Sequence, residues 1–171
     1  KTGLALRDTT PRLQDDYGVV LASVSYHGTT IRHASDRLKN DFDIALVAFK
    51  QNFNAIDYIS PELKGNINFA LSVVKLNGLA LECLAETLKN NVDVVKAALM
   101  QSHESIAINR KVLTHVGDML RNNEDFNSQV LCEFGNGLEF VNSPDKLLAN
   151  TNIIKKVVER YGSFLVFAND H

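Results

Sequence analysis

The sequence predicts an all-α fold, a solenoid (superhelix) built from helical repeats of about 25 residues each. Three observations predict it. The tetrapeptide GLAL occurs at 3–6 and again at 78–81, three repeats apart. Positions one period apart repeat the same kind of residue, and the segments between them place apolar residues three and four apart, as amphipathic helices do. One unit cannot bury its own apolar face, so we expect about five to six units to stack around a shared core, in a superhelix of either hand.

Four columns of residues define the unit. The glycine column advances in steps of 25, with one step of 34, through Gly3, Gly28, Phe53, Gly78, His103, Gly137 and Gly162. Three residues later every unit has a large apolar residue: Leu6, Ile31, Ile56, Leu81, Ile106, Phe140 and Leu165. Ten residues after the glycine column comes a leucine: Leu13, Leu38, Leu63, Leu88, Leu113 and Leu147. Twelve residues before it comes Asp or Asn: Asp16, Asp41, Asn66, Asn91, Asp125 and Asn150.

The Asp and Asn column predicts where the longer helix of each unit begins. A side-chain oxygen at this position accepts hydrogen bonds from the free amides of the first turn. We therefore expect helices of about ten residues to begin near 16, 41, 66, 91, 125 and 150. The glycine that follows is expected to end each helix in the left-handed conformation. Where Phe53 replaces glycine, either Asn52 takes that conformation or the helix ends with another geometry.

A second, shorter helix follows the glycine in each unit, as in LALECLAETLKN at 79–90. Pro11 and Pro61 share one column of this segment, and proline suits the first position of a helix. The segment is therefore either one short helix or one to two turns, a break and a further turn.

One stretch departs from the period. The step of 34 leaves extra residues around 114–124, which form either a longer loop or an extra helical turn. In the next unit Glu133 falls in a core column, and we expect Phe134 beside it to take the core place. We expect residues 1–171 to be a single domain cut from a longer protein, with apolar surface exposed at both ends.

The repeat resembles the family catalogued as domain of unknown function 4116. Its pattern, D-x-D-x-V-x-x-A-V-x-x-N-G-x-A-L-x-x-A-x-x-x-L-K-N, is matched closely by NINFALSVVKLNGLALECLAETLKN at 66–90 and also at 41–65. The resemblance covers nearly the whole chain and is weakest over 91–149. It implies a helical array of a kind common in secreted effectors of intracellular bacteria and in protists, and therefore a host-cell cytoplasm as the place of action. It assigns no catalytic residues.

Composition argues against several classes of protein. The net charge is −2 and no basic stripe stands out, whereas nucleic-acid binders neutralise phosphates with basic residues. No apolar run is long enough to span a bilayer. The two cysteines, Cys83 and Cys132, form no disulfide framework, which predicts a reducing compartment and a packing role for both.

The sequence offers no constellation for catalysis, a metal or a cofactor. His27 and His33 lie six apart across a predicted helix break, and His103 stands in the glycine column, so we expect no zinc site. The motifs GxSxG, GxGxxG and Walker A are absent from the sequence. Asp16 and Asp41 serve as helix caps, and Glu62, Glu82 and Glu86 fall on predicted exposed positions. We expect no enzymatic activity.

The most variable columns predict the functional surface. They lie near the ends of the long and short helices and contain Tyr26, His27, Arg32, His33, Gln51, Asn52, Tyr58, Glu82, Arg160 and Tyr161. If each set lies along one face, it forms the mixture of aromatic, amide and charged groups found at protein interfaces. We therefore predict a scaffold or recognition module for a protein partner. The alternatives are a structural spacer attached to a catalytic domain elsewhere and an RNA-binding helical repeat, which would need a basic flank. The exposed ends also allow end-to-end self-association.

Overall fold

The computed structural model describes residues 3–101, 106–135 and 144–161, and every regular element within these ranges is helical. The all-α class is therefore confirmed. In this part of the chain, no helix is both long enough and apolar enough to cross a membrane.

Four units follow one another from the N-terminus, and each contains the same three elements. A 3₁₀ helix of six residues comes first, then an α-helix of four residues and an α-helix of ten. They are η1 (Gly3–Asp8), α1 (Pro11–Gln14) and α2 (Tyr17–Tyr26); η2 (Gly28–His33), α3 (Asp36–Lys39) and α4 (Phe42–Gln51); η3 (Phe53–Tyr58), α5 (Pro61–Lys64) and α6 (Ile67–Leu76); and η4 (Gly78–Cys83), α7 (Glu86–Lys89) and α8 (Val92–Gln101). The shorter half of the unit is thus interrupted: a 3₁₀ helix, a break, and one turn of α-helix.

The C-terminal part is less regular. α9 (Ile106–Thr114), a nine-residue α-helix, stands where the earlier units have a 3₁₀ helix. It is followed by α10 (Asp118–Arg121), α11 (Glu124–Phe134), α12 (Pro144–Leu148) and α13 (Thr151–Arg160). The interval from the start of α8 to the start of α11 is longer than one period, and its extra residues precede α10. Part of the extra length is helix, because α9 is longer than the 3₁₀ helices that it replaces; residues 102–105, before α9, lie outside the described residues.

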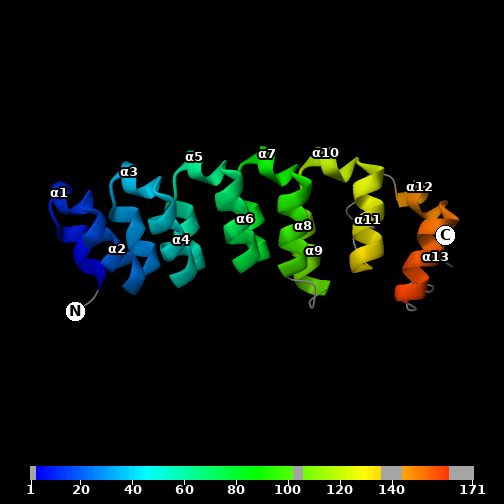
Figure 1. Ribbon diagram of the computed structural model, residues 1–171, viewed down its shortest axis with the longest axis horizontal. Helices are drawn as coiled ribbons and strands as arrows, with labels where there is room; N and C mark the ends of the chain where they lie inside the picture. The colour runs from blue at the N-terminus through cyan, green and yellow to red at the C-terminus, as the bar shows by residue number, and fades with distance from the viewer. Residues whose placement is uncertain (1–2, 102–105, 136–143, 162–171) are drawn as a thin grey trace.

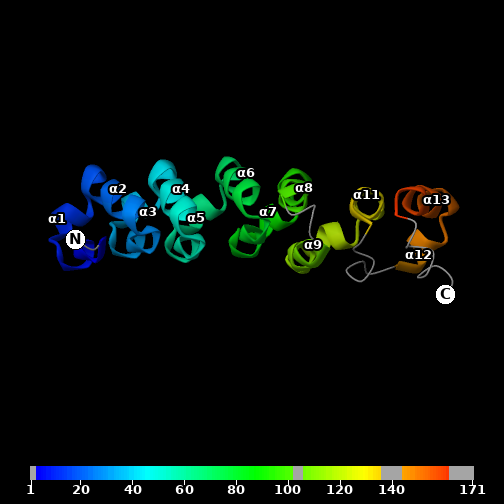
Figure 2. The ribbon, with the colours of Figure 1, turned by 90° about the horizontal axis from the view of Figure 1, so that it is seen from below.

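The helices are arranged in two layers. The long helices α2, α4, α6, α8, α11 and α13 lie side by side along the molecule, with α3, α5, α7 and α10 along one edge (Figure 1). Seen from below, the 3₁₀ helices and α9 form the second layer, beside the row of long helices (Figure 2). Within each layer, neighbours in the first four units pack in chain order, α2 on α4, α4 on α6 and α6 on α8, and η1 to η4 likewise.

Side-chain caps begin most of the long helices as predicted. The expected Asp or Asn accepts a hydrogen bond from an amide two or three residues later at Asp16, Asp41, Asn66, Asn91 and Asn150. The prediction for Asp125 is wrong. Because α11 begins earlier than the period suggests, Asn123 is its cap and accepts from the Phe126 amide at 2.8 Å, and Asp125 lies in the first turn.

The predicted left-handed role of the glycine column is wrong at Gly28 and Gly78, whereas Gly137 and Gly162 lie outside the described residues. The long helices end at His27, Asn52 and Asn77 in extended backbone, and Asn52 itself has φ −152°. Of the glycines in the described residues, only Gly135 has a positive φ, 64°. It ends α11 in the left-handed conformation.

Glycine is required at 28 and 78 by a close approach between units. A Cβ at Gly28 would lie 2.2 Å from the Ala48 carbonyl oxygen, and one at Gly78 would lie 2.4 Å from that of Ala98. α4 and α6 approach less closely, and their junction holds Phe53 in the glycine column instead. Aromatic contacts fill this wider space: Phe49 lies 5.5 Å from Phe53, and Phe42 lies 5.7 Å from Phe69 between ring centroids.

The core runs between the two layers. Leu6, Ile31, Ile56 and Leu81 are buried as predicted, whereas Phe140 and Leu165 lie outside the described residues. The leucine column is buried at Leu38, Leu63, Leu88 and Leu147. In the irregular unit, Leu120 rather than Leu113 occupies the matching place in the short helix, because α10 is displaced along the chain.

Two corrections concern α11. Counted from the start of the helix, Val130 and Leu131 occupy the core columns, and both are buried. Phe134 is only half-buried, so the prediction that it takes the core place is wrong. Cys132 is half-buried as well and does not lie in the core column to which the period assigned it.

The first unit exposes apolar surface, as predicted for an end of the array. Leu13, Tyr17 and Val19 are 36–43% exposed. In the following unit the equivalents of Leu13 and Val19 are Leu38 and Ile44, and both are fully buried. The difference arises because a preceding unit covers Leu38 and Ile44 but not Leu13 and Val19.

Candidate partner-binding surfaces

A ladder of backbone hydrogen bonds joins successive units along the edge of short helices. The residue before each short helix donates its amide to the carbonyl of the last residue of the preceding short helix. The pairs are Ser35 to Gln14 at 2.9 Å, Ser60 to Lys39 at 3.2 Å, Ala85 to Lys64 at 3.2 Å and Gly117 to Lys89 at 2.9 Å. The donor residue can be Ser, Ala or Gly, because only backbone atoms form these bonds. The ladder therefore fixes the spacing of successive units, so equivalent exposed residues of neighbouring units lie at a repeating distance from one another.

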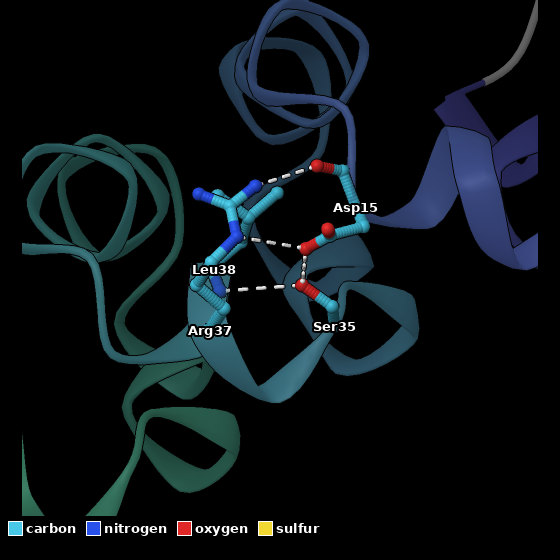
Figure 3. Close-up of polar contacts among 4 residues, drawn as sticks. All are labelled: Asp15, Ser35, Arg37 and Leu38. Atoms are coloured by element: carbon cyan, nitrogen blue, oxygen red, sulfur yellow. Dashed lines mark hydrogen bonds and ion pairs between the residues drawn. The ribbon is translucent and has the colours of Figure 1, made fainter.

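Side chains reinforce the ladder at the first junction, as Figure 3 shows. Arg37 donates to the Asp15 carboxylate at 3.0 Å and to its carbonyl at 2.7 Å, and Ser35 donates its hydroxyl to the same carboxylate. The Ser35 oxygen also caps α3 by accepting from the Leu38 amide. These hydrogen bonds, first from Ser35 and then from Arg37, hold the pKa of Asp15 below its usual value. The junction is a structural clasp between units.

The predicted binding residues fall on two separate edges of the molecule. The C-terminal ends of the long helices, together with the residue after each, form the first, which we call the turn edge: Tyr26, His27, Gln51, Asn52, Leu76 and Met100. The last two residues of each 3₁₀ helix form the second, which we call the 3₁₀ ridge: Arg7, Asp8, Arg32, His33, Asp57, Tyr58, Glu82 and Cys83. Since the 3₁₀ helices run back from the turn edge toward the short helices, the two surfaces lie at opposite ends of the units.

The turn edge exposes large apolar side chains. Tyr26 is 61% exposed, Leu76 44% and Met100 65%. The Tyr26 ring meets the His27 ring edge-on, with centroids 4.8 Å apart, and both residues are exposed. The sequence singled out the tyrosine and histidine; it missed Met100, which lies one residue before the end of α8.

Gln51 and Asn52 belong to the turn edge but already serve the fold. Gln51 donates to the Tyr26 carbonyl at 3.1 Å and accepts from the Gly28 amide, and Gln101 accepts from the Gly78 amide at 2.8 Å. The Asn52 oxygen caps η3 by accepting from the Asn54 amide. Glutamine thus pairs with glycine at both close junctions and supports the backbone beneath Tyr26.

On the 3₁₀ ridge, Arg32, Tyr58 and Glu82 are exposed, whereas His33 is half-buried. Arg32 donates its Nε to His33 Nε2 at 2.8 Å. Burial, followed by the charges of Arg32 and Arg7, lowers the pKa of His33 and so favours the neutral imidazole that accepts this bond. Glu82 lies 3.7 Å from His115 Nε2.

The two cysteines differ in their surroundings. Cys83 is half-buried on the 3₁₀ ridge, and burial, then the charges of Asp57 and Glu82, raises the pKa of its thiol. A raised pKa disfavours the thiolate that nucleophilic chemistry needs. Cys132 lines a cavity of about 310 Å³ between α11 and α13, together with Ser128, Gln129, Glu133, Asn150, Asn152, Ile153 and Lys156. The sequence missed this cavity because the shifted start of α11 moves Cys132 out of the core column.

Arg160 is the last residue of α13 and Tyr161 follows it, at the end corresponding to the turn edge, but Tyr161 is turned inward. Its hydroxyl donates to the Glu133 carbonyl, and its ring lies against Gly135, where a Cβ would come within 2.6 Å. The exposed Arg160 guanidinium lies 5.8 Å from the Tyr161 ring centroid. Tyr161 therefore anchors α13 to the end of α11.

The described residues contain no group of three or more His, Cys, Asp or Glu side chains placed to hold a metal ion.

A family model described as Domain of unknown function (DUF4116) matches residues 16–64 and 66–121. The chain belongs to the DUF4116 family. The DUF4116 match runs from the cap of α2 to the end of α10 and leaves α11 to α13 outside it. No curated protein and no solved structure matches this DUF4116 chain.

Proposed function

We propose that this DUF4116 chain is a non-enzymatic α-solenoid that binds a protein partner through the turn edge. One observation carries the proposal: Tyr26, Leu76 and Met100 expose large apolar side chains at the ends of parallel helices. Exposed apolar groups gathered on one surface are typical of interaction sites, and tyrosine is enriched among the residues that dominate binding energy.

The frame beneath the turn edge supports the same proposal. Backbone bonds between units, and the glutamine bridges of Gln51 and Gln101, fix the positions of the exposed groups before any partner arrives. A preorganised surface loses less conformational entropy on binding. The resemblance to repeats of secreted effectors extends the proposal to a host protein as the partner.

Capture of partners from a eukaryotic lysate tests the proposal. The native chain is compared with a Tyr26→Ser, Leu76→Ser double variant, and Met119→Ser is the matched control. Met119 is 76% exposed but lies on α10, at the edge of short helices. Because all three side chains are exposed, the variants should keep native stability within about 0.5 kcal/mol.

We expect one protein to be recovered with the native chain and with the Met119 variant, and to be lost with the double variant. Equal recovery with the turn-edge variant contradicts the proposal for this surface. Recovery of nothing by any of the folded chains favours the alternative, a spacer that carries a catalytic domain elsewhere in the protein.

A further inference from the structure

The 3₁₀ ridge carries an ordered pattern of charge. The next-to-last residues of η1, η2, η3 and η4 are Arg7, Arg32, Asp57 and Glu82, one in each of four successive units. All four side chains are exposed. Read along the molecule, the column is positive, positive, negative, negative, with one charge per repeat. When two such columns face each other in opposite directions, each positive residue lies opposite a negative one.

We propose that a second copy of the chain packs on the 3₁₀ ridge in antiparallel orientation. A two-fold axis that crosses the ridge between η2 and η3 brings Arg32 opposite Asp57 of the partner subunit and Arg7 opposite Glu82 of the partner subunit. The symmetry repeats both pairs, as in any isologous dimer. This side-by-side arrangement differs from the end-to-end association that the apolar end of the first unit allows, and it goes beyond the proposed function, which uses the opposite edge.

The inner pairs are better placed than the outer ones. Arg32 uses its Nε to bond His33, which leaves its two terminal nitrogens for a carboxylate. Tyr58, 37% exposed, lies next to Asp57 and adds apolar contact close to the axis. Glu82 is already near His115, so the outer pairs have a competing partner within the chain.

A second basic column, Lys39, Lys64 and Lys89, lies on the neighbouring short helices. Lys39 and Lys89 are paired within their own units, with Asp36 at 3.4 Å and Glu86 at 3.6 Å. Lys64 donates to the Asp57 carbonyl at 3.5 Å. Lys39 and Lys89 thus have carboxylates of their own units nearby, whereas Lys64 and the exposed Asp8 beside Arg7 add one charge of each sign to this surface.

Two complementary variants test the dimer by sedimentation equilibrium at low salt. One reverses the positive half of the column, Arg7→Glu with Arg32→Glu; the other reverses the negative half, Asp57→Arg with Glu82→Arg. We expect the native chain to dimerise and each variant alone to be monomeric, because the reversed columns carry one sign throughout. An equimolar mixture of the two variants should recover the dimer.

Salt and a charge-matched control complete the test. Because exposed charges are screened by salt, the dimer dissociation constant should rise about tenfold between low salt and high salt, when the Debye length falls from about 30 Å to about 3 Å. Lys50→Glu with Lys75→Glu changes the net charge by the same amount as the first variant but lies away from the ridge, and should dimerise as the native chain does. The proposal is overturned if the native chain is monomeric at low salt, if a single-sign variant still dimerises, or if the mixture does not associate. None of these outcomes bears on the turn edge, whose residues stay unchanged.

Discussion

The helices of the first four units and those of the units after α8 pack together in different ways. From η1 to α8, each unit repeats the same three elements. The core cluster of these units continues through α9 and α10 into α11, as far as Val130. Beyond α8 an α-helix replaces the 3₁₀ helix, and Leu131 and Val157 begin a separate cluster with a cavity beside it. The two closest junctions have a 3₁₀ helix whose first residue is glycine. At the Phe53 junction aromatic rings fill the wider space, whereas between α11 and α13 a cavity remains.

Breaking a close junction should give the largest effect. Gly78→Ala places a Cβ 2.4 Å from the Ala98 carbonyl oxygen and disturbs the bond from the Gly78 amide to Gln101. We expect a loss of about 3 kcal/mol in the free energy of unfolding, measured by urea denaturation.

Gly18 provides the matched control for this substitution. A Cβ there would meet no atom closer than 3.5 Å, and Gly18 lies in the first turn of α2. Gly18→Ala should therefore raise stability by about 0.5–1 kcal/mol, since alanine is the better helix former. Equal effects of the two substitutions would refute the close-approach explanation.

Truncating the second core cluster tests whether the two regions unfold separately. Leu131→Ala should cost about 2–4 kcal/mol, because Leu131 is buried and truncation leaves a cavity. Native-state hydrogen exchange should show lost protection in α11 and α13 and unchanged protection in α4, α6 and α8. Leu81→Ala, in the first cluster, should lower protection in α4, α6 and α8 and leave protection in α11 and α13 unchanged. A uniform loss of protection in both variants would show one cooperative core instead.

The register of α11 can be checked at its cap. Asn123→Ala removes the side chain that accepts from the Phe126 amide and should cost about 1 kcal/mol. Asp125→Ala removes only a charge in the first turn and should cost less than about 0.5 kcal/mol, whereas it would cost about 1 kcal/mol if Asp125 were the cap. Thermal unfolding of the two variants decides between the structure and the strict sequence period, which puts the cap at Asp125.

The smallest expected effect concerns the clasp of the first junction. Since the pKa of Asp15 is lowered in the folded chain, its contribution to stability is present above the unfolded pKa of about 3.9 and is lost as the pH falls through the folded value. Arg37→Gln removes one donor to the carboxylate, so the pKa of Asp15 should rise toward its usual value in a carboxyl NMR titration. Lys39→Gln is the control. Because Lys39 pairs with Asp36 instead, this substitution should leave the pKa of Asp15 unchanged.

The sequence was sufficient for the helical class, the unit length and most helix starts, because these depend on local chemistry that recurs at a fixed period. Caps at Asp16, Asp41 and Asn66 need only the following three residues. It failed at Gly28, where the reason for glycine is the Ala48 carbonyl in the next long helix. Nothing near Gly28 distinguishes a left-handed helix end from close packing against a later unit.

The candidate surfaces were predictable only as columns. The pattern identified Tyr26 and Arg32 as variable positions, but their separation onto opposite edges depends on the 3₁₀ helix between them running back across the unit. The cavity beside Cys132 could not be foreseen, since it depends on the displaced start of α11. Met100 was missed because it stands one position before the variable column at the other helix ends.

Removal of one unit tests the central claim, that the repeat is the building block of a stacked array. Deleting residues 41–65 joins Asn40 to Asn66, so that the cap of α6 replaces that of α4 and the ladder stays in register. We predict a chain that unfolds cooperatively, keeps the native helical fraction in circular dichroism and has a smaller radius of gyration in small-angle scattering. Deleting residues 41–61 is the control, because it leaves the later units out of register and should abolish cooperative unfolding. Loss of folding in both chains, or retention in both, would contradict the account.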